Sequence, residues 1–124
     1  ALHCLVNYAR ARTGAPALRP NAWLIRTANG KVTRVRKCQQ FSHTPCGIPN
    51  TLAGSGLSRL GEVIYAGRTA QRGTPRATMA AWLASPPHRG AVLNRAYRVI
   101  GIGHARQAPL NGSSAWVWVA NLGV

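Results

Sequence analysis

Residues 98–123, RVIGIGHARQAPLNGSSAWVWVANLG, decide the fold class of this 124-residue chain. The stretch from Arg98 to His104 has the apolar residues of a β-strand, and its two glycines allow another element to pack close to it. Asn111-Gly112 is a turn signal, and residues 114–122 alternate large apolar side chains as a paired strand does. The segment therefore predicts a C-terminal β-hairpin.

Three helices are predicted upstream of this hairpin. An apolar face with helical spacing runs from Leu2 through Ala9, so a helix is expected to extend to about Arg12 before Gly14 and Pro16 end it. Thr74-Pro75 and Ser85-Pro86 each combine a capping hydroxyl with a proline at the first helical position. The helix that starts at Thr74-Pro75 is expected to end near Ala84. Helices followed by a terminal hairpin indicate an α+β fold.

Residues 23–36 fit two local structures. Asn29-Gly30 between two apolar stretches is a strong hairpin signal. The apolar residues of the same segment also lie close to one helical stripe, and local rules alone favour the hairpin. Residues 44–60 are rich in glycine, proline, serine and threonine and are expected to form a loop.

The charge balance is extreme, with 14 arginines, two lysines and a single acid, Glu62, for a formal net charge of +15. One carboxylate cannot build a multi-carboxylate metal cage or the paired carboxylates of glycosidases and aspartic proteases. The positive charge predicts attraction to anions such as a cell-envelope polymer, an anionic lipid or nucleic acid. Because the arginines are scattered, the pattern favours generic attraction over specific nucleic-acid recognition. No apolar run is long enough to span a membrane.

Three cysteines, Cys4, Cys38 and Cys46, allow three different disulfides with one thiol left over, or three free thiols. A bond from Cys4 to Cys38 would tie the first two helical segments together, and one from Cys38 to Cys46 would close a short loop. The chain begins at Ala1 with no apolar leader segment, as expected of a processed secreted protein or of a piece of a longer one.

Three polar residues are the candidate site. His43 lies in FSHTPCG, Glu62 in GEVIYAG and His88 in SPPHR. A lone histidine is usually a surface residue or a hydrogen-bonded core residue. The only carboxylate of a strongly basic chain suggests a requirement at that position. His3 is interpreted as helix surface and His104 as a strand-end residue.

The chain resembles the CAP superfamily of SCP/PR-1-like domains, in its bacterial form. LVNYAR (5–10) resembles the opening helix of the family, with Asn7 and Arg10 at its signature positions. The stretches 41–43, 61–64 and 82–89 resemble the first histidine motif, the Gly-Glu-Asn-Ile motif and the second histidine motif, and 99–103 and 118–123 resemble the terminal strands. Each motif alone is weak, but together they cover nearly the whole chain in the family order.

The resemblance implies one secreted domain over residues 1–124, an α-β-α sandwich whose helices flank a small, mainly antiparallel sheet. It favours a helix from Leu24 to Phe41 over the hairpin. The chain departs from the family at Val63, which replaces an asparagine, and near Ser85, where a second glutamate is missing. Three of the four cavity positions remain: His43, Glu62 and His88.

These three residues suggest several functions. Two histidines and a glutamate can ligate zinc or another divalent metal, although the positive field predicts weak binding. The family also implies binding of a small-molecule or lipid ligand in an extracellular or cell-envelope setting. The alternatives are a hydrogen-bonded structural network, a metal-assisted hydrolase, a Ser-His-Glu arrangement using Glu62, and a basic module that binds polyanions through arginine.

Overall fold

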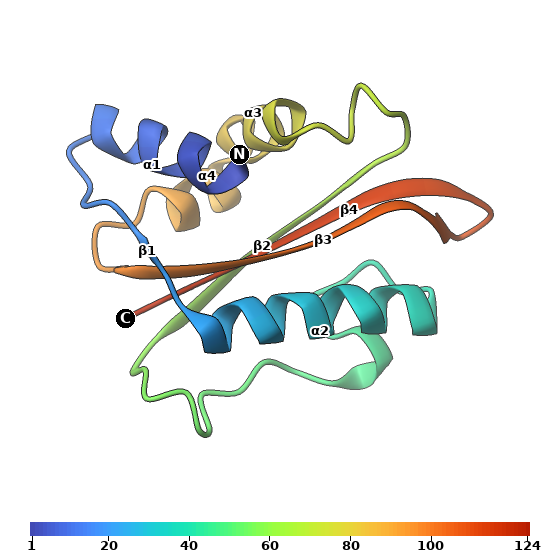
Figure 1. The fold of residues 1–124 in the computed structure, drawn as a ribbon, viewed down its shortest axis with the longest axis horizontal. Coiled ribbons are helices and arrows are strands. Elements are labelled where there is room, and N and C mark those ends of the chain that lie inside the picture. Colours follow the sequence, from blue (N-terminus) through green and yellow to red (C-terminus); the bar gives the residue numbers. More distant parts are fainter.

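The computed structural model describes residues 1–124 and contains four α-helices, one 3-10 turn and one four-stranded sheet (Figure 1). The sheet has the order β1-β3-β4-β2; β1 is parallel to β3 and the other pairs are antiparallel. This confirms the predicted α+β class with a mainly antiparallel sheet. The elements are α1 (Leu2–Arg12), β1 (Arg19–Pro20), α2 (Ala22–Cys38), η1 (Pro45–Gly47), β2 (Leu60–Gly67), α3 (Pro75–Ala84), α4 (Pro86–Val92), β3 (Val99–Leu110) and β4 (Ser113–Gly123).

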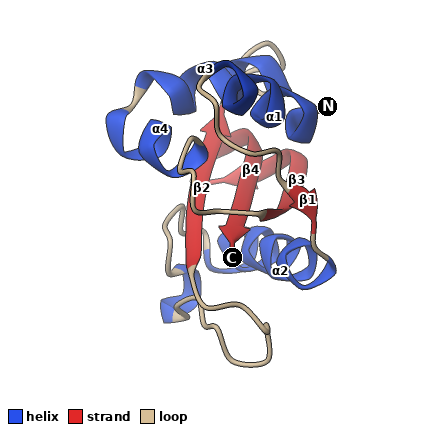
Figure 2. Cartoon of the chain, turned by 90° about the vertical axis from the view of Figure 1, so that its left-hand side faces the viewer, coloured by secondary structure: helices blue, strands red, loops and turns tan.

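Helices cover both faces of the sheet, which confirms the predicted sandwich. Figures 1 and 2 show α1, α3 and α4 together on one face and α2 alone on the other. Each interface has its own apolar core. Trp82 and Val92 belong to the cluster under the three helices, whereas Ala28 and Val35 belong to the cluster under α2. No helix has the length and apolar composition needed to cross a membrane.

The helices with clear end signals are confirmed. Helix α1 spans Leu2–Arg12, and α3 begins at Pro75 after Thr74, whose hydroxyl accepts a hydrogen bond from the backbone N–H of Ala77 at 3.1 Å. Helix α4 begins directly after Ser85. These signals act within one helical turn, so local sequence is sufficient to predict them.

Residues 22–38 form one helix, so the hairpin interpretation of Asn29-Gly30 is wrong and the helix implied by the family resemblance is confirmed. Asn21 caps the helix, its side-chain oxygen accepting from the N–H of Leu24 at 2.9 Å. The helical stripe Leu24, Ala28, Val32 and Val35 is fully or almost fully buried against the sheet. Burial of this stripe outweighs the cost of about 1 kcal/mol that Gly30 adds inside the helix.

The strands differ in three ways from the sequence expectation. Strands β1 (Arg19–Pro20) and β2 (Leu60–Gly67) are not among the expected elements, and β3 continues beyond His104 to Leu110 through an irregularity between Ala105 and Ala108. His104 is therefore not at a strand end. It stacks on Trp118 of β4, with ring centroids 3.6 Å apart, and burial, with a smaller contribution from Arg106, lowers its pKa.

Helix α2 lies directly against β3 because two glycines leave room for its backbone. A Cβ at Gly101 would lie 2.1 Å from backbone atoms of Leu24 and Ile25, and one at Gly103 would lie 2.5 Å from the backbone of Ala28. Real side chains do not tolerate such distances, so these positions require glycine. The sequence predicted that another element packs close to these two glycines, and that element is α2.

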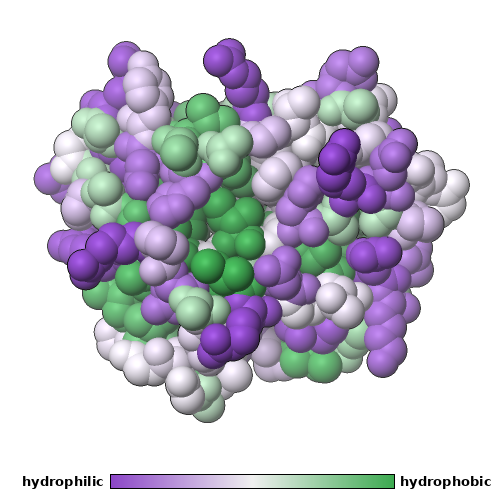
Figure 3. All heavy atoms as spheres, in the orientation of Figure 1, coloured by the Kyte–Doolittle hydropathy of each residue, from purple (hydrophilic) through white to green (hydrophobic).

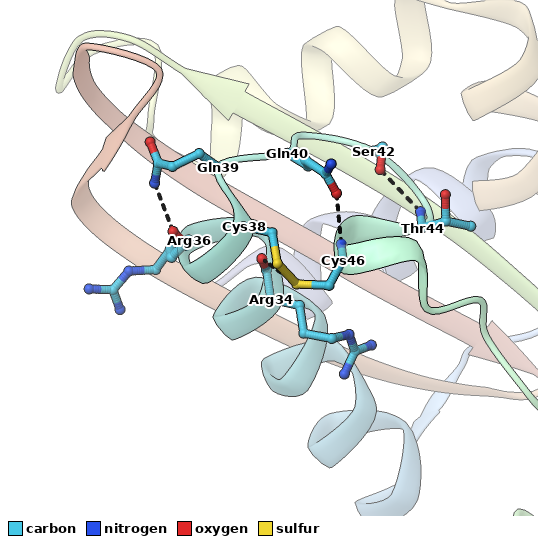
Figure 4. Close-up of a disulfide and its surroundings, with 8 residues drawn as sticks. All are labelled: Arg34, Arg36, Cys38, Gln39, Gln40, Ser42, Thr44 and Cys46. Carbon is cyan, nitrogen blue, oxygen red and sulfur yellow. Dashed lines mark hydrogen bonds between the residues drawn. A yellow bond between two sulfur atoms is a disulfide. The ribbon is translucent and has the colours of Figure 1, made fainter.

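The disulfide joins Cys38, the last residue of α2, to Cys46 in the η1 turn, with a Cα–Cα distance of 5.5 Å (Figure 4). Of the pairings that the sequence left open, the one that closes the short loop is formed. Cys4 is an exposed free thiol. The bond and a hydrogen bond from the Cys46 N–H to Gln40 Oε1 (2.7 Å) hold the chain after α2 against the end of the helix.

Two glycine substitutions test the packing of α2. We expect Gly103→Ala to lower the free energy of unfolding by about 1–3 kcal/mol, because its methyl group overlaps the α2 backbone. Gly30→Ala is the matched control: its methyl group would meet only an Arg34 guanidinium nitrogen at 3.4 Å, so the better helix former should stabilise the protein by about 0.5–1 kcal/mol. Urea denaturation measures both, and equal effects would contradict this packing.

Candidate functional site

Glu62 points from β2 toward α2 because side chains alternate between the two faces of a strand. Its neighbours in sequence show the alternation: Val63 belongs to the core under α1, α3 and α4, and Ile64 belongs to the core under α2. Glu62 pairs in register with Asn121 of β4. The Glu62 side chain is only 4% exposed, so the one carboxylate of the chain is buried.

Lys31 of α2 is the closest cation to this carboxylate. Its ammonium nitrogen lies 3.3 Å from Glu62 Oε1, and its side chain is completely buried. The same nitrogen donates a hydrogen bond to the backbone carbonyl of His43. A buried charge needs both an opposite charge and hydrogen bonds. Lys31 and Glu62 are each other's opposite charge, and the hydrogen bond from Lys31 to the His43 carbonyl also holds the loop after α2.

His43 approaches the same oxygen from the loop between α2 and η1. Its Nδ1 lies 2.8 Å from Glu62 Oε1, while 55% of the side chain is exposed. This is the only hydrogen bond of the imidazole. The carboxylate therefore orients the ring, and Nε2 faces away from it.

The second oxygen of Glu62 is occupied by two amides. Asn50 Nδ2 donates to Oε2 at 3.1 Å. Asn121 donates to Oε2 at 2.7 Å in the amide orientation that also lets its oxygen accept from Thr27 Oγ1 and from the N–H of Ala28. We call Lys31, His43, Asn50, Glu62 and Asn121 the Glu62 cluster. Both carboxylate oxygens in it are fully engaged.

The sequence pointed to His43 and Glu62 but did not identify the other three members of the Glu62 cluster, Lys31, Asn50 and Asn121. Lys31 carried a usable signal, because it lies next to the buried stripe of α2, where a lysine needs a buried partner and Glu62 is the only acid available. Asn50 and Asn121 carried no such signal. Their role depends on how the 48–51 segment folds back and on which strand pairs with β2.

His88 does not join His43 and Glu62. It lies near the start of α4, and Val92 of that helix packs into the core on the opposite face of the sheet from the Glu62 side chain (Figure 2). The Nδ1 atom of His88 hydrogen-bonds Ser85 Oγ at 2.9 Å. No hydrogen bond or ion pair joins His88 to His43 or Glu62, so the structure shows no direct polar contact among all three residues of the expected group.

The donor arrangement does not fit a divalent metal ion. His43 and Glu62 supply two ligands, but the ammonium of Lys31 already lies against the carboxylate oxygen that faces His43. The chain has no cluster of three or more histidine, cysteine or acidic side chains able to hold a metal ion. Zinc sites in proteins use three or four such ligands.

A nucleophile is also missing beside the oriented imidazole. No serine, threonine or cysteine side chain hydrogen-bonds the His43 ring. Ser42 Oγ accepts from the N–H of Thr44, and Cys46 is in the disulfide (Figure 4). Ser85 and His88 do form a pair, but Glu62 hydrogen-bonds neither of them. A Ser-His-Glu relay is not assembled.

The two signature positions of the opening helix are structural. Asn7 bridges both backbone groups of Leu18, accepting from its N–H at 2.8 Å and donating to its carbonyl at 3.1 Å. Arg10 is completely buried and donates to four backbone carbonyls, which belong to Pro16, Val92, Asn94 and Tyr97. Burial, with a smaller contribution from Arg98, lowers the pKa of Arg10. His3 also hydrogen-bonds the Leu18 carbonyl, at 2.8 Å, and is half-buried rather than plain helix surface.

Solved structures with the same fold come from bacteria. An extracellular protein containing an SCP domain from Bacillus anthracis aligns with a TM-score of 0.74 and 21% identity, covering 98% of this chain and 38% of that one. An outer surface protein of Borrelia burgdorferi aligns with a TM-score of 0.74 and 20% identity, covering 98% and 88%. A cysteine-rich secretory protein of Staphylococcus aureus aligns with a TM-score of 0.69 and 16% identity, covering 98% and 37%.

These TM-scores establish a common fold. The chain spans 38% of the length of the Bacillus anthracis protein and 37% of the Staphylococcus aureus protein. No curated protein matches the chain by sequence. The model of the CAP family, described as the cysteine-rich secretory protein family, matches residues 4–122, so this chain belongs to the CAP family.

Proposed function

We propose that this chain is a binding domain of an extracellular or cell-envelope protein that associates with anionic polymers through its arginines. In this proposal the Glu62 cluster is structural and holds the loop after α2 against the sheet. The setting is supported by the extracellular and outer-surface descriptions of the bacterial proteins that share the fold.

The observation that carries the proposal is a surface with many cations and no side-chain carboxylate. Every arginine except Arg10 and Arg34 is exposed, and the only acid, Glu62, is buried. Hydrophilic side chains project at the top and along the left and right of the face in Figure 3. With no exposed acid to neutralise them, these arginines create a positive potential that attracts polyanions from any direction.

The alternatives place the function at the candidate residues instead. They are a divalent metal, a small molecule or a lipid held around His43, Glu62 and His88, and a metal-assisted hydrolase using the same residues. The saturation of Glu62 by four donors, none of which is His88, favours a structural role for the cluster.

Binding to dextran sulfate tests the proposed function. We expect the protein to bind immobilised dextran sulfate with an affinity that falls linearly with salt on logarithmic axes, because binding releases counterions from the polymer. Neutral dextran is the matched control and should not bind. Equal binding to both polymers, or an affinity independent of salt, would contradict the proposal.

The structural role of the cluster is tested by removing its charges. We expect Glu62→Gln to lower the free energy of unfolding by about 3–5 kcal/mol, because it leaves the buried ammonium of Lys31 without a counter-charge. The double variant Lys31→Met/Glu62→Gln should cost less than the sum of the single variants, as is usual for a coupled pair. His88→Ala is the control outside the cluster. A Glu62→Gln variant as stable as the unmodified protein would show that the cluster is not structural.

A zinc titration separates the proposal from the metal alternatives. Calorimetry on the metal-free protein near neutral pH should show no stoichiometric site that depends on both His43 and His88. The comparison uses His43→Ala and His88→Ala beside the unmodified protein. Stoichiometric binding that each substitution abolishes would establish a metal site and overturn the structural assignment.

A further inference from the structure

A pocket of about 300 Å³ opens between α2 and the 48–51 segment, next to the Glu62 cluster. We propose that this pocket, the α2 pocket, binds a small organic anion: a phosphate or carboxylate carried on a group of monosaccharide size. The inference deepens the proposed function, on which it rests, by giving the general attraction to anions a defined site.

Two arginines on one face of α2 line the pocket. Arg26, Gly30 and Arg34 are four residues apart, so they lie above one another along the helix. Gly30 has no side chain to fill the space between them. A Cβ built at Gly30 would have only Arg34 Nη1 nearby, at 3.4 Å, so the Arg34 guanidinium lies over this gap.

Neither guanidinium has a partner within the protein. Arg34 is half-buried, and its Nε is buried without any hydrogen bond. Arg26 donates no hydrogen bond either, and Glu62, the only acid, is already engaged by its own cluster. A buried polar atom without a partner is costly, and a bound oxyanion would supply the missing acceptor.

The remaining walls suit a small ring-bearing anion. Trp23 and Ile48 provide apolar surface, and the side chains of Asn50 and Thr51 provide hydrogen-bonding groups. The volume is at the lower end of the range for ligand pockets, which limits the ligand to about one sugar ring. No acidic residue lines the pocket, so a cation is excluded, whereas a planar guanidinium matches the two oxygens of a carboxylate or phosphate.

Arg36 provides a matched control on the same helix. It is exposed and does not line the pocket. Figure 4 shows the side chains of Arg34 and Arg36 leaving α2 in different directions. Replacing either arginine by glutamine removes the same charge, so a difference between the variants reports the pocket and not the overall charge.

The test is calorimetry with glucose 6-phosphate, glucuronate and glucose. We expect one-to-one binding of one or both anionic sugars and none of glucose, and the sugar that binds tells whether the pocket prefers phosphate or carboxylate. Arg34→Gln and Arg26→Gln should each weaken this binding at least about tenfold, because each removes a charge-assisted contact. Arg36→Gln should leave it unchanged within about twofold.

A fourth variant keeps the charge and fills the space. Gly30→Leu should abolish binding of the anionic sugar while both arginines remain, and thermal unfolding would verify that each variant is folded.

The proposal is overturned if no anionic sugar binds, if glucose binds equally well, or if Arg36→Gln weakens binding as much as Arg34→Gln. Dextran sulfate binding is measured in parallel. If it persists when the sugars fail to bind, the pocket alone is rejected; if it is absent, the polyanion function is rejected as well.

Discussion

The close approach of α2 to β3 is the constraint on which the rest of this structure depends. The missing side chains of Gly101 and Gly103 allow the helix backbone to lie directly on the strand. That position brings Lys31 to Glu62 and fixes where the chain leaves α2 at Cys38. The loop that carries His43 and Asn50, and with it one wall of the α2 pocket, is therefore positioned by two glycines far away in the sequence.

The charge distribution explains how a chain with one acid remains folded. Its stability cannot rest on exposed ion pairs, so its buried cations use other acceptors. Arg10 donates to three carbonyls at and after the end of α4 and to that of Pro16 after α1, and Lys31 takes the only carboxylate. The remaining arginines are exposed, except for Arg34, which is half-buried and has no hydrogen-bond partner. Some of the exposed ones, Arg68, Arg95 and Arg98, also donate to backbone carbonyls. The cations that hold the fold through such bonds differ from those, such as Arg26 and Arg34, that remain available to a ligand.

Membership of the CAP family does not by itself settle the site. The resemblance suggested one group of His43, Glu62 and His88, but the polar contacts of the structure join only His43 to Glu62, while His88 bonds Ser85. Beside the saturated carboxylate lies a pocket lined by Arg26 and by Arg34, whose buried Nε has no hydrogen-bond partner.

The sequence by itself determined α1, the starts of α3 and α4, and the terminal hairpin, because caps, prolines and apolar spacing act within a few residues. For residues 22–38 both patterns were present, and local rules alone favoured the hairpin, wrongly. The family resemblance favoured the helix, and the physical reason for it is burial of its apolar stripe against the sheet. The sequence also singled out Glu62 without identifying most of its partners. Those partners come from helix packing, strand pairing and loop return, which exist only in the tertiary structure; Asn121, for example, lies beside Glu62 only because β2 pairs with β4.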